Sequence, residues 1–344
     1  MNDSVSAAFW LRQFKQRLET FRSFESELYS VNERSFADIA LRLFRFQAER
    51  NEVYRSFIQH LRVDVGSVST VEDIPFMPIS FFKDHVIKTG DWQPEVTFTS
   101  SSTTGTGVSR HPVASLEFYL QNATRTFEFF FGSLTNFHFL ALLPSYLERE
   151  GSSLIAMMDH FIRASGSRHS GFYLYNVEQL IKDLNAIDDE RNIVLWGVSY
   201  ALLDLAEQHP MNLKAMLFET GGMKGRRKEL TRDDLHQTLT RAFGVKTIHS
   251  EYGMTELMSQ AYTRGGTRFI CPPWMRIVGR DLTDPLTKGL LSETSGINVV
   301  DLANLHSVAF IETQDLGKVF GDGTFEILGR TDNSDVRGCN LLVN

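Results

Sequence analysis

The first third of the chain carries apolar residues at helical spacing. Positions three and four apart recur in two sets, Phe36, Ile39, Ala40 and Leu43, then Tyr54, Phe57, Ile58 and Leu61. Such spacing gathers the apolar side chains into a stripe along one side of a helix. We therefore expect two amphipathic helices whose stripes pack into the core.

From position 137 the pattern changes to short apolar runs, each followed by a loop and an amphipathic stretch. The runs read FHFLALL (137–143), NIVLWG (192–197), KAMLFE (214–219) and VKTI (245–248). Uninterrupted apolar runs that alternate with amphipathic stretches indicate parallel strands buried on both faces, joined by crossover helices. One predicted helix, RKELTRDDLHQTLTRAF (227–243), ends at Gly244, a typical C-cap residue.

After Gly279 the runs become shorter and follow one another through glycine turns. They read NVVDL (298–302), SVAFIE (307–312) and FEILGR (325–330), with GDG (321–323) before the last. This pattern predicts antiparallel strands. We expect an α/β protein with an N-terminal helical segment packed on the main domain (1–70), an α/β core (71–280), and a small β subdomain with a C-terminal segment (281–344).

Composition narrows the function classes. The 344 residues are 42% hydrophobic with a net charge of −7, which suits a globular protein and argues against a nucleic-acid partner. There is no apolar run long enough for a membrane span and no signal-peptide pattern at the N-terminus, so we expect a cytoplasmic protein. Two cysteines are too few for a disulfide framework or a zinc cage, and we expect Cys271 to be structural.

The segment FTSSSTTGTGVSRH (98–111) is unusually rich in hydroxyl side chains and glycine. Small residues let backbone N–H groups converge, so this loop can wrap a phosphate with N–H and O–H donors. It lacks the Lys-Ser or Lys-Thr of a Walker A loop. A plain solvated loop explains the same composition when the segment is taken alone.

Further polar segments follow the predicted strands, where open α/β sheets bind ligands. They are ETGGMKG (219–225), HSEYGMTE (249–256), TQDLG (313–317) and GRTD (329–332). Glu256 is a plausible magnesium ligand, because Mg²⁺ that bridges phosphates takes one or two carboxylates from the protein. Each segment alone is also an ordinary turn or an acidic helix start.

Taken in order, these segments resemble the motifs of adenylate-forming enzymes, from about position 74 to the end of the chain. Within that superfamily the chain is most similar to the acyl-protein synthetases of bacterial luciferase systems, the LuxE family. The likeness lies in IPFMPISFFK (74–83), EYGMTELMSQAY (251–262) and SDVRGCNLLV (334–343). The resemblance implies the large domain of an adenylate-forming enzyme, with parallel α/β layers and a small β subdomain.

The resemblance also implies ATP and Mg²⁺ as cofactors and assigns roles to matching positions. Gly221, Gly222 and Tyr252 would border the adenine, and Thr255 would contact the α-phosphate. Glu256 would hold Mg²⁺, while Asp315 would bind the ribose hydroxyls beside Arg330. The phosphate loop would comprise Ser100, Ser101, Ser102, Thr103, Thr104 and Gly105.

Two departures from the superfamily pattern affect these expectations. The phosphate loop usually continues through Pro-Lys, whereas Gly107-Val-Ser-Arg-His follows here, which leaves the cationic role of Arg110 or His111 open. Fourteen residues follow Arg330, fewer than the roughly 50 that a domain needs, so we expect no C-terminal lid domain. This favours an acyl-protein synthetase over an acyl-CoA ligase.

The LuxE likeness implies that Cys339 receives the acyl group and passes it to a partner protein, an acyl reductase, with a fatty acid as substrate. A thiolate attacks the mixed anhydride of an acyl-adenylate readily, and AMP is a good leaving group. As an arbitrary cysteine, Cys339 would instead be a small hydrophobic residue packed on the core.

Two other function classes stay open on the sequence. Gly197-Val-Ser-Tyr-Ala201 resembles an imperfect nucleophile elbow, and Ser199, Asp301 and His306 occur in the chain order of an α/β-hydrolase triad. That interpretation leaves the ordered motifs unexplained. The third class is a nucleotide-binding protein without catalysis.

Overall fold

The computed structural model describes residues 21–100, 107–144, 151–221, 230–284 and 286–330. The helices are α2 (Glu33–Arg50), α3 (Glu52–His60), α4 (Phe81–Asp84), α5 (Leu116–Phe131), α6 (Ser153–Ala164), α7 (Val177–Ala186), α8 (Ser199–Gln208) and α9 (Arg232–Phe243), with 3₁₀ turns η1 (Val71–Asp73) and η2 (Leu134–Asn136). The strands are β1 (Met77–Pro78), β2 (Val96–Thr99), β3 (Arg110–Val113), β4 (Phe137–Leu142), β5 (Gly171–Tyr173), β6 (Asn192–Val198), β7 (Met216–Thr220), β8 (Ile248–Tyr252), β9 (Ala261–Thr263), β10 (Phe269–Ile270), β11 (Met275–Arg280), β12 (Thr294–Asp301), β13 (Phe310–Val319) and β14 (Phe325–Arg330).

One large sheet runs through the molecule and changes character at β8. Its order is β11-β12-β13-β14-β10-β9-β8-β7-β6-β4-β5, with β1 pairing parallel to β13. Strands β4 to β8 pair in parallel, whereas every pair from β8–β9 to β11–β12 is antiparallel. The carboxyl end of β8 therefore lies where the two halves of the sheet join.

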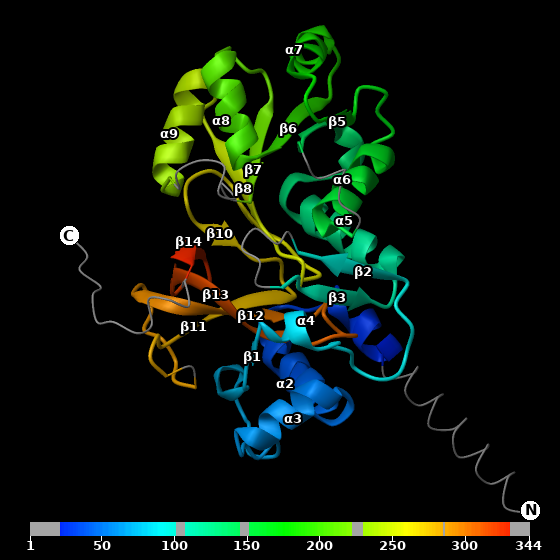
Figure 1. The fold of residues 1–344 in the computed structure, drawn as a ribbon, viewed down its shortest axis with the longest axis vertical. Helices are drawn as coiled ribbons and strands as arrows, with labels where there is room; N and C mark the ends of the chain where they lie inside the picture. Colours follow the sequence, from blue (N-terminus) through cyan, green and yellow to red (C-terminus); the bar gives the residue numbers. More distant parts are fainter. Residues whose placement is uncertain (1–20, 101–106, 145–150, 222–229, 285, 331–344) are drawn as a thin grey trace, which may run out of the picture.

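Helices cover both faces of the parallel half. Figure 1 shows α5 and α6 on one side of β6–β8 and α8 and α9 on the other. Burial on both faces explains why β4 and β6 are almost uninterrupted apolar runs. The predicted parallel α/β core is confirmed in its architecture.

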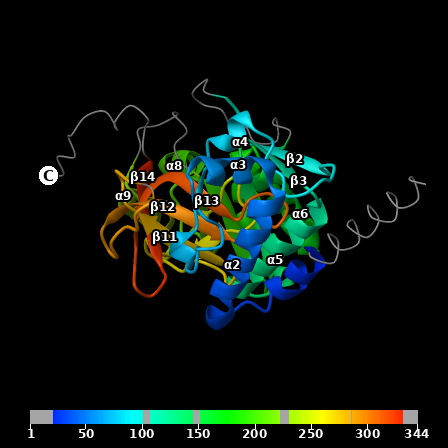
Figure 2. The ribbon, with the colours of Figure 1, turned by 90° about the horizontal axis from the view of Figure 1, so that it is seen from below.

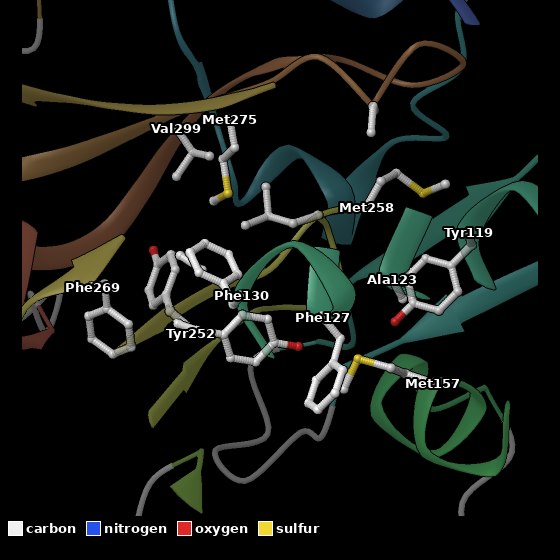
Figure 3. Close-up of a cluster of buried hydrophobic side chains, with 14 of the residues drawn as sticks. Tyr119, Ala123, Phe127, Phe130, Met157, Tyr252, Met258, Phe269, Met275 and Val299 are labelled. Atoms are coloured by element: carbon white, nitrogen blue, oxygen red, sulfur yellow. The ribbon is translucent and has the colours of Figure 1, made fainter. Parts of the chain in front are cut away.

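Phe127 of α5 lies at the centre of an aromatic layer between that helix and the sheet. Its ring centroid lies 5.0–6.3 Å from those of Phe131, Phe137, Phe139, Phe161, Trp196, Phe218 and Tyr262. Figure 3 shows Phe127 in the same cluster as Tyr119 and Ala123 of α5 and Met157 of α6. Aromatic pairs at these separations add to the burial of apolar area, so this layer anchors α5 on the sheet.

Helices α2 and α3 pack against the antiparallel half, as Figures 1 and 2 both show. Helix α2 begins at a capping box, in which Asn32 and Ser35 satisfy each other's backbone N–H groups. Gln47 is buried and bonds to the loop before β13, donating to Asn304 O (2.9 Å) and accepting from Ala309 N (2.9 Å). The predicted apolar stripe of α2 is confirmed as core, because all four of its residues are buried.

Several element boundaries differ from the predicted ones. Helix α9 begins at Arg232, capped by the Thr231 hydroxyl, and ends as predicted at Gly244, which has a φ of +63°. The strand predicted over 245–248 begins only at Ile248, because the preceding residues carry the chain from α9 to the sheet. Antiparallel pairing also starts before Gly279, in the very short strands β9 and β10, which are too brief to give a periodic signal.

In the described part of the chain, no helix combines the length and the apolar character that a membrane crossing requires.

The aromatic layer makes a stability prediction. Phe127→Ala should lower the free energy of unfolding by about 3–5 kcal/mol, the usual cost of emptying a buried phenylalanine site. Phe129→Ala, on the same helix but 52% exposed, is the matched control and should change it by less than about 0.5 kcal/mol. Urea denaturation followed by circular dichroism measures both, and equal losses would contradict the packing.

Candidate active site

The predicted site residues gather at the carboxyl ends of β7 and β8. Gly221 directly follows β7, and Thr255 and Glu256 follow β8 through a short turn. Asp315 lies on β13 and Arg330 ends β14, across the junction between the two halves of the sheet. Loops at the carboxyl ends of parallel strands are where open α/β sheets bind ligands.

Asp315 ties the two halves of the sheet together. Its carboxylate accepts a hydrogen bond from the Tyr252 hydroxyl (2.8 Å) and an ion-paired one from Arg330 Nε (3.0 Å). Asp315 and Tyr252 are buried, whereas the Arg330 side chain is exposed. Burial raises the pKa of Tyr252 well above its ordinary value, and the charge of Asp315 raises it further. Tyr252 therefore stays a neutral hydrogen-bond donor.

The Thr255–Glu256 turn is held from three sides. His111 Nδ1 lies 2.9 Å from the Thr255 carbonyl oxygen, and Asn304 Nδ2 donates to the Glu256 carbonyl oxygen (2.9 Å). The Glu256 carboxyl is hydrogen-bonded to Ser109. Burial raises the pKa of Glu256, while the Ser109 bond and the charge of Arg330 oppose that rise. The turn is thus fixed before any ligand binds.

Two of the residues that hold this turn, Ser109 and His111, belong to the hydroxyl-rich segment (98–111). Strands β2 and β3 form a hairpin, in which Ser100 N donates to Ser109 O (3.1 Å) and Ser109 N donates to Ser100 Oγ (3.0 Å). Ser109, directly before β3, and His111 of β3 then reach to the turn after β8. The structure therefore brings Ser100 and the base of the predicted phosphate loop beside Thr255 and Glu256.

Of the two candidate cations near the predicted phosphate loop, Arg110 and His111, the structure argues against His111. His111 is buried, and its other ring nitrogen, Nε2, lies 3.1 Å from Ser307 Oγ. Burial lowers the pKa of His111 to about 4, so it is neutral at physiological pH and is a structural support rather than a cation. Arg110 is exposed at the adjacent position of β3. The side chain of Lys83 on α4 lies beside Gly107, in the segment that connects β2 and β3. A Cβ built on Gly107 would be 3.9 Å from Lys83 Cβ and Cδ.

Ser199, Asp301 and His306 do not form the hydrogen-bonded relay that a hydrolase triad needs. Ser199 Oγ donates to Glu219 Oε2 (3.0 Å) and Gly221 O (2.9 Å). Asp301 accepts from Ser259 Oγ (2.7 Å) and from the backbone around it. His306 stacks on Phe21 with ring centroids 4.5 Å apart. Ser199 instead belongs to a buried network that reaches the carbonyl of Gly221, directly after β7.

Glu219 is the centre of that network. Arg232 and His236 of α9 approach its carboxylate at 3.4 and 3.7 Å. Burial raises the pKa of Glu219, but the His236 hydrogen bond and the Arg232 charge outweigh it and leave the pKa below its ordinary value. The Glu219 carboxylate is therefore charged, and the nearby Arg232 guanidinium compensates its charge, as a buried ion requires.

Several predicted residues lie outside the described residues: Ser101, Ser102, Thr103, Thr104, Gly105, Gly222 and Cys339. Cys271 is half-buried and packed against the core, and burial raises the pKa of its thiol, which suits the structural role expected for it. No role was predicted for Ser109 or Lys83. For Ser109, the available signal was its place near the end of the hydroxyl-rich segment, two positions before His111.

Comparisons with solved structures give the fold a context. The chain is similar to ATP-bound MatB from Rhodopseudomonas palustris, with a TM-score of 0.52 and 16% identity over 68% of this chain and 47% of that one. It is also similar to an open conformation of 2-hydroxyisobutyryl-CoA ligase in complex with 2-HIB-AMP and CoA, with a TM-score of 0.64 and 12% identity over 88% of this chain and 70% of that one. The postadenylation state of the same ligase, with R3-HIB-AMP, gives a TM-score of 0.63 and 11% identity over 88% and 68% of the two chains.

These similarities confirm the predicted fold class: the chain has the mixed α/β fold of the large domain of adenylate-forming enzymes. It spans about half the length of MatB. No family model and no curated protein matches the sequence. At such low identities the likeness concerns the fold, and the chemistry has to be argued from the site.

The buried His111 predicts an acid-sensitive stability. Its pKa falls from about 6.5 in the unfolded chain to about 4 in the folded one, so between these pH values the unfolded state binds the extra proton. The free energy of unfolding should therefore decrease as the pH falls through this window, by roughly 3 kcal/mol at ~1.4 kcal/mol per unit.

His111→Gln should make this slope less steep without abolishing it, because burial also lowers the pKa of His306 to about 4. His60→Gln, at an exposed position, should preserve the slope. Urea denaturation at several pH values between 4 and 7 gives the slopes. A His111→Gln slope equal to that of the unsubstituted protein would show that this residue is not buried in its neutral form.

Proposed function

We propose that the protein activates a carboxylic acid with ATP, forming an acyl-adenylate and pyrophosphate. One observation carries the proposal: the Asp315 carboxylate, held by Tyr252 and Arg330, lies close enough to Glu256 for its charge to raise the pKa of that carboxyl. The turn that carries Glu256 is itself bonded to the hydroxyl-rich hairpin. A paired carboxylate suits the two hydroxyls of a ribose. A hairpin of hydroxyl and N–H donors suits phosphates.

The parts of a nucleotide then match the order of the site. Asp315 binds the ribose hydroxyls, and Gly221, Gly222 and Tyr252 border the adenine. The phosphates lie along the loop from Ser100 to Gly105, with Thr255 at the α-phosphate. Lys83, whose side chain lies beside Gly107, is our candidate to replace the lysine missing from the loop. An ammonium there offsets phosphate charge, which is the main contribution of a protein to phosphoryl chemistry.

Glu256 fits a magnesium ion that is held mainly by phosphates and water. Its carboxyl is buried beside the hairpin, and Mg²⁺ bound with nucleotides needs only one or two protein carboxylates. Within the described ranges no cluster of three or more acidic, histidine or cysteine side chains forms a protein-only metal cage. When bound, the ion would neutralise charge on the phosphates.

In the first reaction a carboxylate oxygen of the acid attacks the α-phosphorus, and the bond from that phosphorus to the pyrophosphate oxygen breaks. The residues of the site hold ATP in position, with Thr255 oriented by the His111 bond to its carbonyl oxygen. Because His111 and Asn304 fix the turn beforehand, little ordering is needed when the substrates bind.

In the second reaction the Cys339 thiolate attacks the acyl carbon, AMP leaves, and a thioester forms. The acyl group then passes to a partner protein, an acyl reductase, as the LuxE likeness of the motifs at 74–83, 251–262 and 334–343 suggests. That likeness also favours a fatty acid. A second candidate acceptor is coenzyme A, because 2-hydroxyisobutyryl-CoA ligase, similar in fold, was solved with CoA and an acyl-AMP.

ATP–pyrophosphate exchange in the presence of carboxylic acids tests the first reaction. Asp315→Asn should raise the KM for ATP about 10- to 100-fold, since it weakens a charge-assisted hydrogen bond of about 1.5–3 kcal/mol. Asp322→Asn is the control, because Asp322 lies in an exposed turn bonded to Thr324. An absence of acid-dependent exchange, or equal KM values for the two variants, would refute the assignment.

The acceptor is tested by trapping the thioester. Cys339→Ala should keep pyrophosphate exchange but form no hydroxylamine-labile acyl adduct, whereas Cys271→Ala should form it as the unsubstituted protein does. Radiolabelled acid with ATP, followed by denaturing gel electrophoresis, measures the adduct. Persistence of the adduct without Cys339 excludes it as acceptor, and acyl-CoA formation at the rate of exchange would favour the ligase.

A further inference from the structure

Glu251 is a partly buried carboxyl that neither the fold nor the proposed nucleotide site requires. It precedes Tyr252 on β8, so its side chain points to the opposite face of the strand from the one that meets Asp315. Its cross-strand neighbours are Thr220 of β7 and Tyr262 of β9. The Thr220 hydroxyl donates to Glu251 Oε2.

The second oxygen of Glu251 lies over Gly253. A Cβ added at Gly253 would collide with Glu251 Oε1 and would lie 3.4 Å from Gln260 Cγ, so these two side chains converge above a glycine that is itself exposed. The absence of a side chain at position 253 creates the room for this convergence. We call Glu251, Gln260 and Tyr262, together with the surface of Gly253, the polar niche.

Two members of the polar niche have buried polar atoms without a partner in the described structure. Gln260 is 3% exposed with Oε1 unbonded, and Tyr262 is fully buried with its hydroxyl unbonded. Leaving a buried polar group unsatisfied costs about 1–3 kcal/mol, so such groups in a binding region indicate a missing ligand atom. This is evidence independent of Glu251.

The charges around Glu251 favour a hydrogen-bond donor. Burial raises the pKa of Glu251 to about 7, the Thr220 hydroxyl lowers it, and the charge of Glu219 raises it. The other titratable groups that interact with it are the phenols of Tyr119 on α5 and Tyr262. None of these described groups is a cation. A ligand hydroxyl or ammonium would therefore supply a second hydrogen-bond donor to the Glu251 carboxyl, beside the Thr220 hydroxyl.

The position along the chain indicates which part of a substrate reaches the niche. Gly253 is two residues from Thr255, the proposed contact of the α-phosphate, and two residues span at most about 7 Å. That distance accommodates the reacting carboxylate and one or two further carbons. The donor would therefore lie on carbon 2 or carbon 3 of the acid.

Resting on the proposed function, we infer that the acid substrate carries a hydroxyl or an ammonium group on carbon 2 or 3, bound by Glu251 and Gln260 above Gly253. An unsubstituted acid would leave Gln260 Oε1 without a partner and Glu251 with the Thr220 hydroxyl as its hydrogen-bond donor. Because a site built to bind a polar substituent rejects the analogue that lacks it, the substituted acid should be preferred at least about tenfold.

The test is ATP–pyrophosphate exchange with sets of acids of equal chain length. Each set contains the unsubstituted acid and its 2-hydroxy, 3-hydroxy, 2-amino and 3-amino derivatives, which distinguishes hydroxyl from ammonium. The readout is the ratio of kcat/KM between each derivative and the unsubstituted acid. Glu251→Gln should reduce the highest ratio about tenfold, the effect of weakening a charge-assisted hydrogen bond.

Glu326→Gln is the matched control, since Glu326 also accepts from a threonine hydroxyl, that of Thr267 (2.6 Å), but on β14 outside the niche. It should keep the ratio. Gln260→Leu should lower the ratio as Glu251→Gln does, and circular dichroism checks that each variant folds.

The outcomes separate the two proposals. Exchange with unsubstituted acids at least as fast as with every derivative, or a ratio unchanged in Glu251→Gln, overturns this inference and leaves the adenylation proposal intact. Exchange with none of the acids refutes the adenylation proposal, and the inference fails with it. A derivative preferred tenfold, with the preference lost in Glu251→Gln and kept in Glu326→Gln, supports it.

Discussion

The bond between Tyr252 and Asp315 is the interaction on which the candidate site depends. It joins β8, the last parallel strand, to β13 in the antiparallel half, at the point where the sheet reverses direction. A buried carboxylate is costly unless its charge is compensated, and here one phenol and one guanidinium provide the compensation. The same carboxylate thus fixes the relative position of the two halves and presents an acceptor at their junction.

A second set of bonds ties the hydroxyl-rich hairpin to the same junction. Ser109, directly before β3, and His111 of β3 hold the turn after β8, and Asn304 holds it from the loop before β13. Three segments far apart in the sequence therefore meet at Thr255 and Glu256. Such preorganisation matters for phosphoryl chemistry, in which the protein contributes mainly position and charge.

Apolar patterning in the sequence was sufficient to predict the parallel core. The uninterrupted runs at 137–143 and 192–197 correspond to strands β4 and β6. The end of α9 was predicted from Gly244, a typical C-cap residue. The short strands β9 and β10 carry too few residues for a period to show. The order of the polar motifs led to Tyr252, Asp315 and Arg330, which the structure brings together.

Other parts of the site depend on contacts that no local pattern encodes. The role of His111 as a neutral support follows from its burial against Thr255 and Ser307, which are 144 and 196 positions away. The convergence of Glu251 and Gln260 over Gly253 requires the β8–β9 pairing. Ser199 lies in a sequence that resembles an imperfect nucleophile elbow, yet its partners are Glu219 and a backbone carbonyl.

The most direct test of the central claim is a crystal structure with a non-hydrolysable acyl-adenylate analogue. The account predicts ribose hydroxyls within hydrogen-bonding distance of the Asp315 carboxylate and the phosphate mimic beside Thr255. An analogue bound elsewhere, with its ribose remote from Asp315, would contradict it.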